Sequence, residues 1–295
     1  MIQNKKILLV GPPGAGKTTI KKAYFDRLDP YELLQNPLDP SRGFSSNLYS
    51  YSKSNLGIFD LAGQENDRWL SNKGKEVFSK TSAIFCIFDI NNSLESIIEF
   101  LIKIYKVKKE LKLESCFINV FLHKIDLANP SYVSHKIKKL KQFIENQHRF
   151  RDDIQLFETS INKNYYYDTF SIISDILNDL YKKGNISIKN DDFKTLKEDF
   201  YRIIGDDTLS DHVVEKNGQN TKYDNSKVGL DLRILETTGL VKRCSKTQYF
   251  QLTERAHYLK IGWEKEKINK SNLNLKEKTN NFHVLLFLNE KAVSN

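Results

Sequence analysis

The residues with the clearest chemical potential lie between Gly11 and Thr18. They read Gly-Pro-Pro-Gly-Ala-Gly-Lys-Thr and directly follow the apolar run Ile7-Leu8-Leu9-Val10. Glycines let the backbone curl so that consecutive amides point at a phosphate, and the following helix adds the positive end of its dipole. Lys17 can then bridge the β- and γ-phosphates while the Thr18 hydroxyl binds Mg²⁺. The pattern predicts a nucleotide site, and the alternative is a glycine-rich turn with an incidental lysine.

Three further polar motifs each follow an apolar run. In Asp60-Leu61-Ala62-Gly63-Gln64-Glu65, Asp60 can hold Mg²⁺ through a water, the Gly63 amide would lie near a γ-phosphate, and Gln64 near an attacking water. In His123-Lys124-Ile125-Asp126, the final aspartate can accept two hydrogen bonds from neighbouring donors on a base edge, which guanine has and adenine lacks. Thr159-Ser160-Ile161 can offer a backbone amide to the guanine carbonyl. Together the motifs predict a guanine nucleotide.

These motifs need a scaffold that brings several strand ends together. Strand-like apolar runs and helical patterns alternate through the first 183 residues, which predicts an α/β fold with a six-stranded, mostly parallel sheet and helices on both faces. Ligands on this architecture bind at the carboxyl ends of the strands, where all the motifs fall. The short link Ser52–Asn55 makes the second strand antiparallel to the third. The expected strands are Lys5–Val10, Asn47–Tyr51, Leu56–Asp60, Ala83–Asp89, Phe117–His123 and Gln155–Thr159, and the expected helices are Lys17–Leu28, Ser93–Leu113, Ser131–Gln147 and Tyr165–Lys182.

Over about residues 5–183 these motifs resemble the Ras-superfamily small GTPases. The closest likeness is to the Rag/Gtr GTPases, whose guanine motif also begins with histidine, as at His123, and whose last motif reads Thr-Ser-Ile. The resemblance implies a P-loop GTPase fold and Mg²⁺-dependent hydrolysis of GTP to GDP and phosphate, with Gln64 and Lys17 as catalytic residues. It implies nucleotide contacts from Gly11, Gly14, Ala15, Gly16, Lys17, Thr18, Thr19, Gly63, His123, Lys124, Asp126, Ser160 and Ile161, and Mg²⁺ ligands from Thr18, Ser41 and Asp60.

The stretch between Leu28 and Asn47 contains prolines 30, 37 and 40 and no clear period, which predicts a long functional loop. Its segment Pro40-Ser41-Arg42-Gly43-Phe44 looks like the Arf-family switch sequence Pro-Thr-x-Gly-Phe, with Ser41 in the place of the switch threonine. We expect two switch loops, at about Leu33–Asn47 and Gly63–Lys75. Arg42 would be either an internal arginine finger or a solvated loop residue, and the second interpretation is favoured.

Three departures from the family pattern have consequences for the chemistry. Ser41 lacks the methyl group that stiffens threonine, so the closed switch would be less stable. Pro13 stands where many family members have glycine, and its ring would crowd Gln64. His123 replaces the usual asparagine, which puts in doubt the link between the base loop and the phosphate loop. We predict slow intrinsic hydrolysis and an activating protein that supplies the missing arginine finger.

Three further predictions concern side chains outside these motifs. Trp69 and Phe78 form either an exposed effector patch or part of the core. Cys86 and Cys116 are expected to be buried core residues. The cysteines have no CxxC spacing, which favours a reduced, cytoplasmic setting.

The second part of the chain shows a different pattern. Helical segments at Asp192–Ile204, Ser210–Lys216 and Ser226–Thr238 precede two short strand patterns, at Gly239–Arg243 and Tyr249–Thr253, and a helix from Glu254. This order resembles a winged helix-turn-helix, whereas a Rag GTPase would carry a roadblock-type domain. We therefore expect a small-GTPase domain at 1–184, a winged-helix-like α+β domain at 185–268 and a polar tail at 269–295, in which Phe282–Leu288 adds a strand or a helix to either domain.

The chain is 39% hydrophobic and 28% charged, as globular proteins are. Its formal charge of +9 is compatible with binding to nucleic acid or to an acidic membrane, and also with a biased genome composition that has no functional meaning. The Ser226–Thr238 helix carries Asp231 and Glu236 beside Lys227 and Arg233, which favours protein effectors or homo- or heterodimerisation over DNA. The alternative is a GTP-responsive, DNA-binding transcription regulator, and a third interpretation is a generic P-loop ATPase or kinase. No apolar run is long enough to predict a transmembrane segment.

Overall fold

A computed structural model describes residues 3–51, 54–148, 150, 153–182, 236–243, 250–271, 285 and 289–290. Its main sheet has the strand order β6-β5-β4-β1-β3-β2-β9. The strands from β6 to β3 are parallel, whereas β2 is antiparallel to β3, as predicted. The six expected strands are β1 (Gln3–Val10), β2 (Phe44–Tyr51), β3 (Ser54–Leu61), β4 (Ala83–Asp89), β5 (Phe117–His123) and β6 (Ile154–Thr159).

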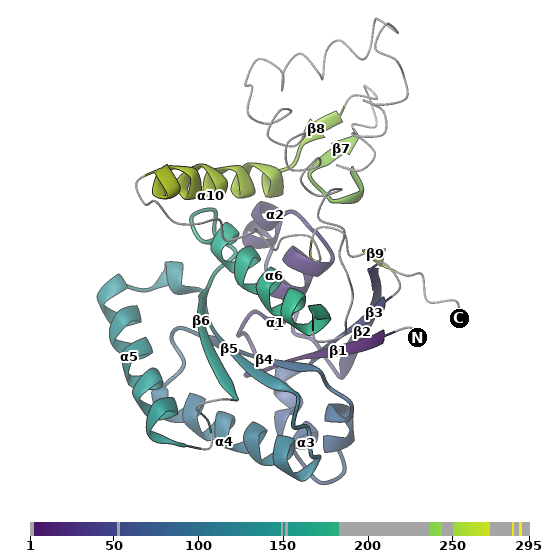
Figure 1. Ribbon diagram of the computed structural model, residues 1–295, viewed down its shortest axis with the longest axis vertical. Coiled ribbons are helices and arrows are strands. Elements are labelled where there is room, and N and C mark those ends of the chain that lie inside the picture. Colours follow the sequence, from purple (N-terminus) through teal and green to yellow (C-terminus); the bar gives the residue numbers. More distant parts are fainter. Residues whose placement is uncertain are drawn as a thin grey trace, which may run out of the picture.

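Two apolar layers cover this sheet, and β1 contributes to both. Ile7 and Leu9 pack on one face with α6, while Leu8 and Val10 pack on the other with α4 and α5 (Figure 1). The inner strands β4 and β5 are buried along nearly their whole length, as continuous apolar runs in parallel sheets usually are. The helices α4 (Leu94–Glu110), α5 (Pro130–Asn146) and α6 (Tyr166–Lys182) confirm three of the four expected helices.

The segment after the phosphate loop differs from the prediction. The expected helix Lys17–Leu28 is a short α1 (Lys17–Ile20) that continues as a π-helical turn, η1 (Lys21–Phe25). The expected loop after it contains a helix, α2 (Pro30–Gln35), which begins where Asp29 accepts a hydrogen bond from the Tyr31 amide. Proline is favoured at the first position of a helix, so Pro30 starts α2 rather than interrupting structure.

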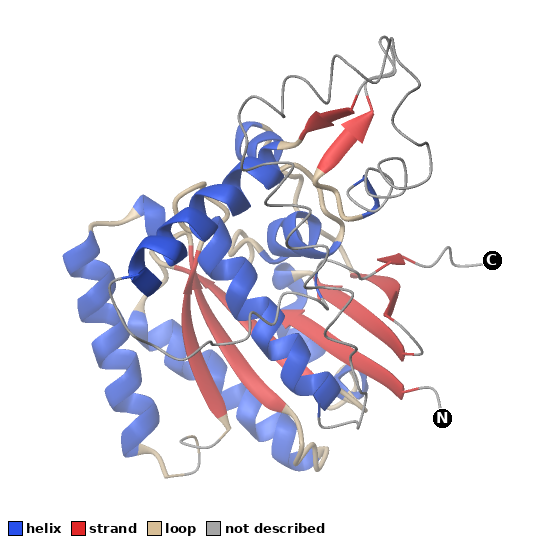
Figure 2. Ribbon diagram, turned by 45° about the horizontal axis from the view of Figure 1, so that its top comes forward, coloured by secondary structure: helices blue, strands red, loops and turns tan. Residues whose placement is uncertain are grey.

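The C-terminal segment contains the expected hairpin and helix. Strands β7 (Val241–Arg243) and β8 (Phe250–Leu252) pair antiparallel, and α10 spans Glu254–Ser271. Figure 2 shows the hairpin set apart from the main sheet. A seventh strand, β9 (Asn289–Glu290), pairs with β2 at the sheet edge, just beyond the predicted Phe282–Leu288. The expected helices before Glu236 lie outside the described residues, so the winged-helix domain and the domain boundaries stay predictions.

The helix α10 packs on α6 and α2, and its contacts join the core of the main sheet. Arg255 is fully buried, and its Nη1 donates to the Ala23 carbonyl at 3.1 Å. The same carbonyl accepts a hydrogen bond from the Tyr166 hydroxyl at 3.1 Å. Tyr258 meets the Tyr166 ring edge-on, with centroids 5.8 Å apart. None of the described helices combines the length and the apolarity needed to cross a lipid bilayer.

Candidate nucleotide-binding site

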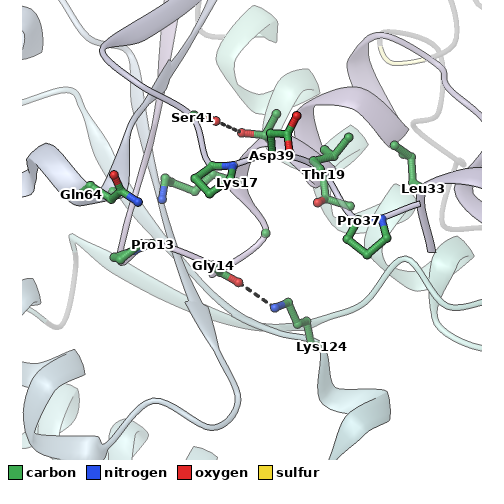
Figure 3. Close-up of a pocket in the computed structure, with 15 residues that line it drawn as sticks. Pro13, Gly14, Lys17, Thr19, Leu33, Pro37, Asp39, Ser41, Gln64 and Lys124 are labelled. Atoms are coloured by element: carbon green, nitrogen blue, oxygen red, sulfur yellow. Dashed lines mark hydrogen bonds between the residues drawn. The ribbon is translucent and has the colours of Figure 1, made fainter. Parts of the chain in front are cut away.

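A cavity of about 360 Å³ opens at the carboxyl ends of β1, β3 and β5. Its walls come from the loop after β1, from the segment between α2 and β2, from the turn after β3 and from Lys124 after β5 (Figure 3). Four segments that are distant in the sequence therefore meet at one cavity. The lining residues are Pro13, Gly14, Gly16, Lys17, Thr18, Thr19, Leu33, Pro37, Leu38, Asp39, Pro40, Ser41, Gly63, Gln64 and Lys124.

Lys17 is the buried cation of this cavity. Its Nζ donates to the Gly11 carbonyl at 2.9 Å and to the Pro12 carbonyl at 2.8 Å, so the ammonium lies within the curve of the loop. Burial lowers the pKa of Lys17 to about 8, although the neighbouring Asp60 acts in the opposite direction. An anion bound in the loop would raise this pKa again, because a neighbouring opposite charge favours the protonated lysine.

Oxygen atoms suited to Mg²⁺ converge beside Lys17. The Thr18 hydroxyl donates to Asp60 Oδ2 at 2.5 Å and lies 2.9 Å from the Ser41 hydroxyl. Asp60 is almost fully buried, and its Oδ1 has no hydrogen-bond partner among the residues that the structure describes. Burial raises the pKa of Asp60 in this arrangement. An orphaned carboxylate oxygen beside two hydroxyl groups fits Mg²⁺, whose remaining ligands in such sites are phosphates and waters.

Within the described part of the chain, no group of three or more His, Cys, Asp or Glu side chains could hold a metal alone.

Asp126, which follows β5, and Ser160, which follows β6, are in direct contact. The Ser160 hydroxyl donates to Asp126 Oδ1 and accepts from the Asn162 amide at 2.9 Å. Lys124 bridges this region to the phosphate loop, since its Nζ donates to the Gly14 carbonyl at 2.6 Å and pairs with Asp89 at 2.8 Å. The expected base-binding and phosphate-binding residues therefore belong to one connected site. Ile161 is buried beside them.

His123 links the base loop to the phosphate loop by packing. A Cβ atom added to Gly16, which has a φ of 95°, would lie 2.6 Å from His123 Cδ2. The His123 Nδ1 lies 3.1 Å from the Thr159 hydroxyl, and burial lowers its pKa to about 3, so the ring is neutral. The doubt raised by the missing asparagine is answered by this contact together with the Lys124–Gly14 hydrogen bond.

The turn after β3 lies directly against the phosphate loop. A Cβ atom on Gly63 would lie 2.5 Å from both Pro12 C and Pro13 N, so only glycine fits this approach. Gln64 lines the cavity on the same side as Pro13 (Figure 3), and the predicted crowding between them stays a prediction.

Trp69 and Phe78 are buried, with exposed fractions of 6% and 0%, so of the two interpretations core packing is confirmed. Arg42 is exposed and does not line the cavity. Cys86 and Cys116 are buried, as predicted.

Comparison with known proteins identifies the family. A model of the Gtr1/RagA G protein conserved region matches residues 6–196. The chain belongs to this family. As a member of the Gtr1/RagA family it is a GTP-binding G protein. Membership of this family also supports GTP hydrolysis as its general activity. No curated protein matches the chain in sequence.

Among solved structures, the translation elongation factor SelB from Methanococcus maripaludis, in complex with the GTP analogue GppNHp, is 13% identical, with a TM-score of 0.43 over 64% of this chain and 35% of that chain. A bacterial selenocysteine-specific elongation factor EF-Sec is 20% identical, with a TM-score of 0.41 over 63% of this chain and 30% of that chain. The chain thus spans about a third of the length of each. Both TM-scores are below 0.5, so these likenesses add nothing to the assignment.

Sequence reasoning missed several residues of the site in this Gtr1/RagA-family protein. Leu33, Leu38 and Asp39 line the cavity, and the proline-rich composition of their segment was the only signal for it. Asp89 pairs with Lys124, and its place at the end of an apolar strand could have indicated a role. The contact of the Ser160 hydroxyl with Asp126 had no sequence signal, because it depends on how β5 and β6 pair.

Proposed function

We propose that this Gtr1/RagA-family protein is a Mg²⁺-dependent GTP switch that hydrolyses GTP slowly on its own. One observation carries the proposal: the phosphate loop and the guanine motif form a single site. Lys124, which lies close to Asp126 at the end of β5, donates a hydrogen bond to the Gly14 carbonyl of the phosphate loop. The phosphate loop and Lys17 would bind the β- and γ-phosphates. The Asp126 carboxylate would accept hydrogen bonds from the guanine edge, and the Ser160 hydroxyl would hold that carboxylate in place.

Thr18, Ser41 and Asp60 would hold Mg²⁺, which when bound neutralises charge on the β- and γ-phosphates. Asp60 would keep the Thr18 hydroxyl oriented, and the Ser41 hydroxyl would bring switch I, at about Leu33–Asn47, toward the nucleotide. Switch II, at about Gly63–Lys75, would place Gln64 against an attacking water. The two switches would order around the γ-phosphate and relax after hydrolysis.

Slow hydrolysis is supported by two observations at the cavity. The backbone of Pro13 lies directly against Gly63, the residue before Gln64, and both Pro13 and Gln64 line the cavity, so the proline ring would limit the space for the carboxamide and a water. No arginine lines the cavity among the described residues. A protein partner would therefore supply the positive charge that stabilises the transition state. Single-turnover hydrolysis by the isolated protein at the rate of a stimulated small GTPase would contradict this proposal.

The C-terminal helix α10 would transmit the nucleotide state to protein effectors. It packs on α2, which leads directly into switch I, and on α6. A rearrangement of switch I would change the surface on which α10 rests. This contact is the physical route by which the C-terminal segment would respond to the exchange of GDP for GTP.

A nucleotide titration tests the base-reading role. The full-length protein is titrated with GTP, GDP and ATP, with and without Mg²⁺, and the titration is repeated with Asp126→Asn. We expect guanine preference in the wild type and its loss in the variant, because an amide offers a donor to a base edge that also donates. Asp179→Asn, an exposed change on α6, is the matched control and should behave as the wild type. Equal affinity of the wild type for ATP and GTP would overturn the proposal.

A further inference from the structure

Gln64 lies in a short turn whose two ends are both fastened to Gly43 of switch I. At one end, the Ala62 amide donates to the Gly43 carbonyl at 2.9 Å. At the other, the Gly43 amide donates to Glu65 Oε1 at 2.5 Å. The turn is also closed on itself, because the Glu65 amide donates to the Ala62 carbonyl at 3.1 Å. Gln64 therefore stands between two anchors on the same residue of the other switch.

Glu65 is held from a second side as well. Arg68 Nη1 donates to Glu65 Oε2 at 2.7 Å, and the Arg68 guanidinium lies 4.9 Å from the centre of the Trp69 ring. Trp69 is buried, and its indole donates to the Ala62 carbonyl at 3.2 Å. The hydrogen bond from Gly43 lowers the pKa of Glu65, so the carboxylate is ionised at neutral pH. Hydrogen bonds to an ionised acceptor are stronger than those to a neutral one.

The side chain of Gln64 depends on this turn for its position. Gln64 lines the cavity, yet its carboxamide makes no hydrogen bond with any residue in the described ranges. Gly43 has a φ of 63°, in the left-handed region that favours glycine, and both of its backbone groups meet the turn. The backbone of the turn, rather than a contact of the carboxamide, thus decides where Gln64 points.

We propose that Glu65 is a positioning residue for GTP hydrolysis: it clips the Gln64 turn to Gly43 and so holds the carboxamide toward the cavity. This role rests on the proposed function. Without the Glu65 carboxylate, the turn keeps only one of its two attachments to Gly43, the hydrogen bond from the Ala62 amide, and Gln64 follows that anchor in the chain. A smaller fraction of molecules then has Gln64 against the attacking water. The phosphate loop and Asp126 do not touch Glu65, so nucleotide affinity is preserved.

The test compares Glu65→Ala, Glu65→Gln and the control Glu76→Ala, an exposed glutamate just after switch II. With saturating GTP and Mg²⁺, Glu65→Ala should hydrolyse about tenfold more slowly in a single turnover, equivalent to about 1.4 kcal/mol. Its dissociation constant for GTP should stay within about twofold of the wild-type value, because only the positioning of Gln64 changes. Glu65→Gln keeps an oxygen that accepts from the Gly43 amide, so its rate should recover to within about threefold of the wild type.

Hydrogen exchange supplies a readout that does not depend on hydrolysis. The Gly43 amide should exchange faster in Glu65→Ala than in the wild type and should be protected again in Glu65→Gln. A Glu65→Ala rate equal to that of Glu76→Ala, or a Glu65→Gln rate as low as that of Glu65→Ala, would overturn the positioning role alone. If the wild type bound no GTP, the proposed function would fail, and this role with it.

Discussion

The pKa of Lys17 makes GTP affinity depend on pH in a range where most lysines do not titrate. With a pKa of about 8 in the ligand-free protein, Lys17 is roughly 90% protonated at pH 7 and roughly 10% at pH 9. Phosphate oxygens beside the Nζ atom favour the charged form, so the pKa rises when the nucleotide binds. Binding above pH 8 therefore takes up a proton, and GTP affinity should fall about tenfold between pH 7 and pH 9.

The assay is a titration with a fluorescent GTP analogue at half-unit steps of pH, with Mg²⁺ held constant. Calorimetry at pH 8.5 in two buffers of different ionisation enthalpy should show uptake of roughly three quarters of a proton on binding. Lys17→Met, which has no titrating group, is the control, and its weaker binding should lose the dependence on pH. A flat profile in the wild type, or the same fall in Lys17→Met, would refute the reasoning.

Three substitutions test the close contacts that support the site and the C-terminal segment. Gly16→Ala places a Cβ atom 2.6 Å from His123 Cδ2, so GTP affinity measured by titration should fall at least about tenfold; unchanged affinity would show that the two loops do not touch. In Gly262→Ala the new Cβ atom would lie 2.1 Å from Tyr167 Cβ, so the melting temperature should fall. This is the opposite of the effect of helix propensity, in which alanine is favoured over glycine by about 1 kcal/mol. A higher melting temperature would contradict the docking of α10. Arg255→Met should raise the free energy of unfolding in urea by about 1–3 kcal/mol, because no described residue accepts a hydrogen bond from Nε or Nη2 of the buried guanidinium; a loss above about 1 kcal/mol would contradict this.

The inner strands could be predicted from the sequence residue by residue. The expected Ala83–Asp89 and Phe117–His123 are the bounds of β4 and β5 in the structure. Their continuous apolar runs are buried on both faces, so local composition and tertiary environment favour the same conformation. The convergence of the strand-end motifs could be predicted as well, because the carboxyl ends of parallel strands meet at one edge of the sheet.

Other elements could not be predicted, because their residues are compatible with more than one local structure. Pro30 was interpreted as part of a loop, although proline after an N-cap residue such as Asp29 also starts helices. The π-helical turn η1 and the edge strand β9 have no local pattern of their own.

The same limit applies to the site. The Ser160–Asp126 contact, the packing of His123 on Gly16 and the attachment of Glu65 to Gly43 each depend on the register of distant segments. Periodicity in one segment carries no information on that register. The expected roles of the site residues stay predictions until nucleotide binding is measured.

The close packing of α10 on α6 also constrains how this chain evolves. Tyr167 fills the space that a side chain at Gly262 would need, and Tyr258 meets the Tyr166 ring in a T-shaped arrangement. A bulkier neighbour on either helix would be tolerated only if its counterpart shrank. In an alignment of relatives that share both helices, these positions should therefore vary as pairs, while lineages that have lost the C-terminal helix should show no such pairing.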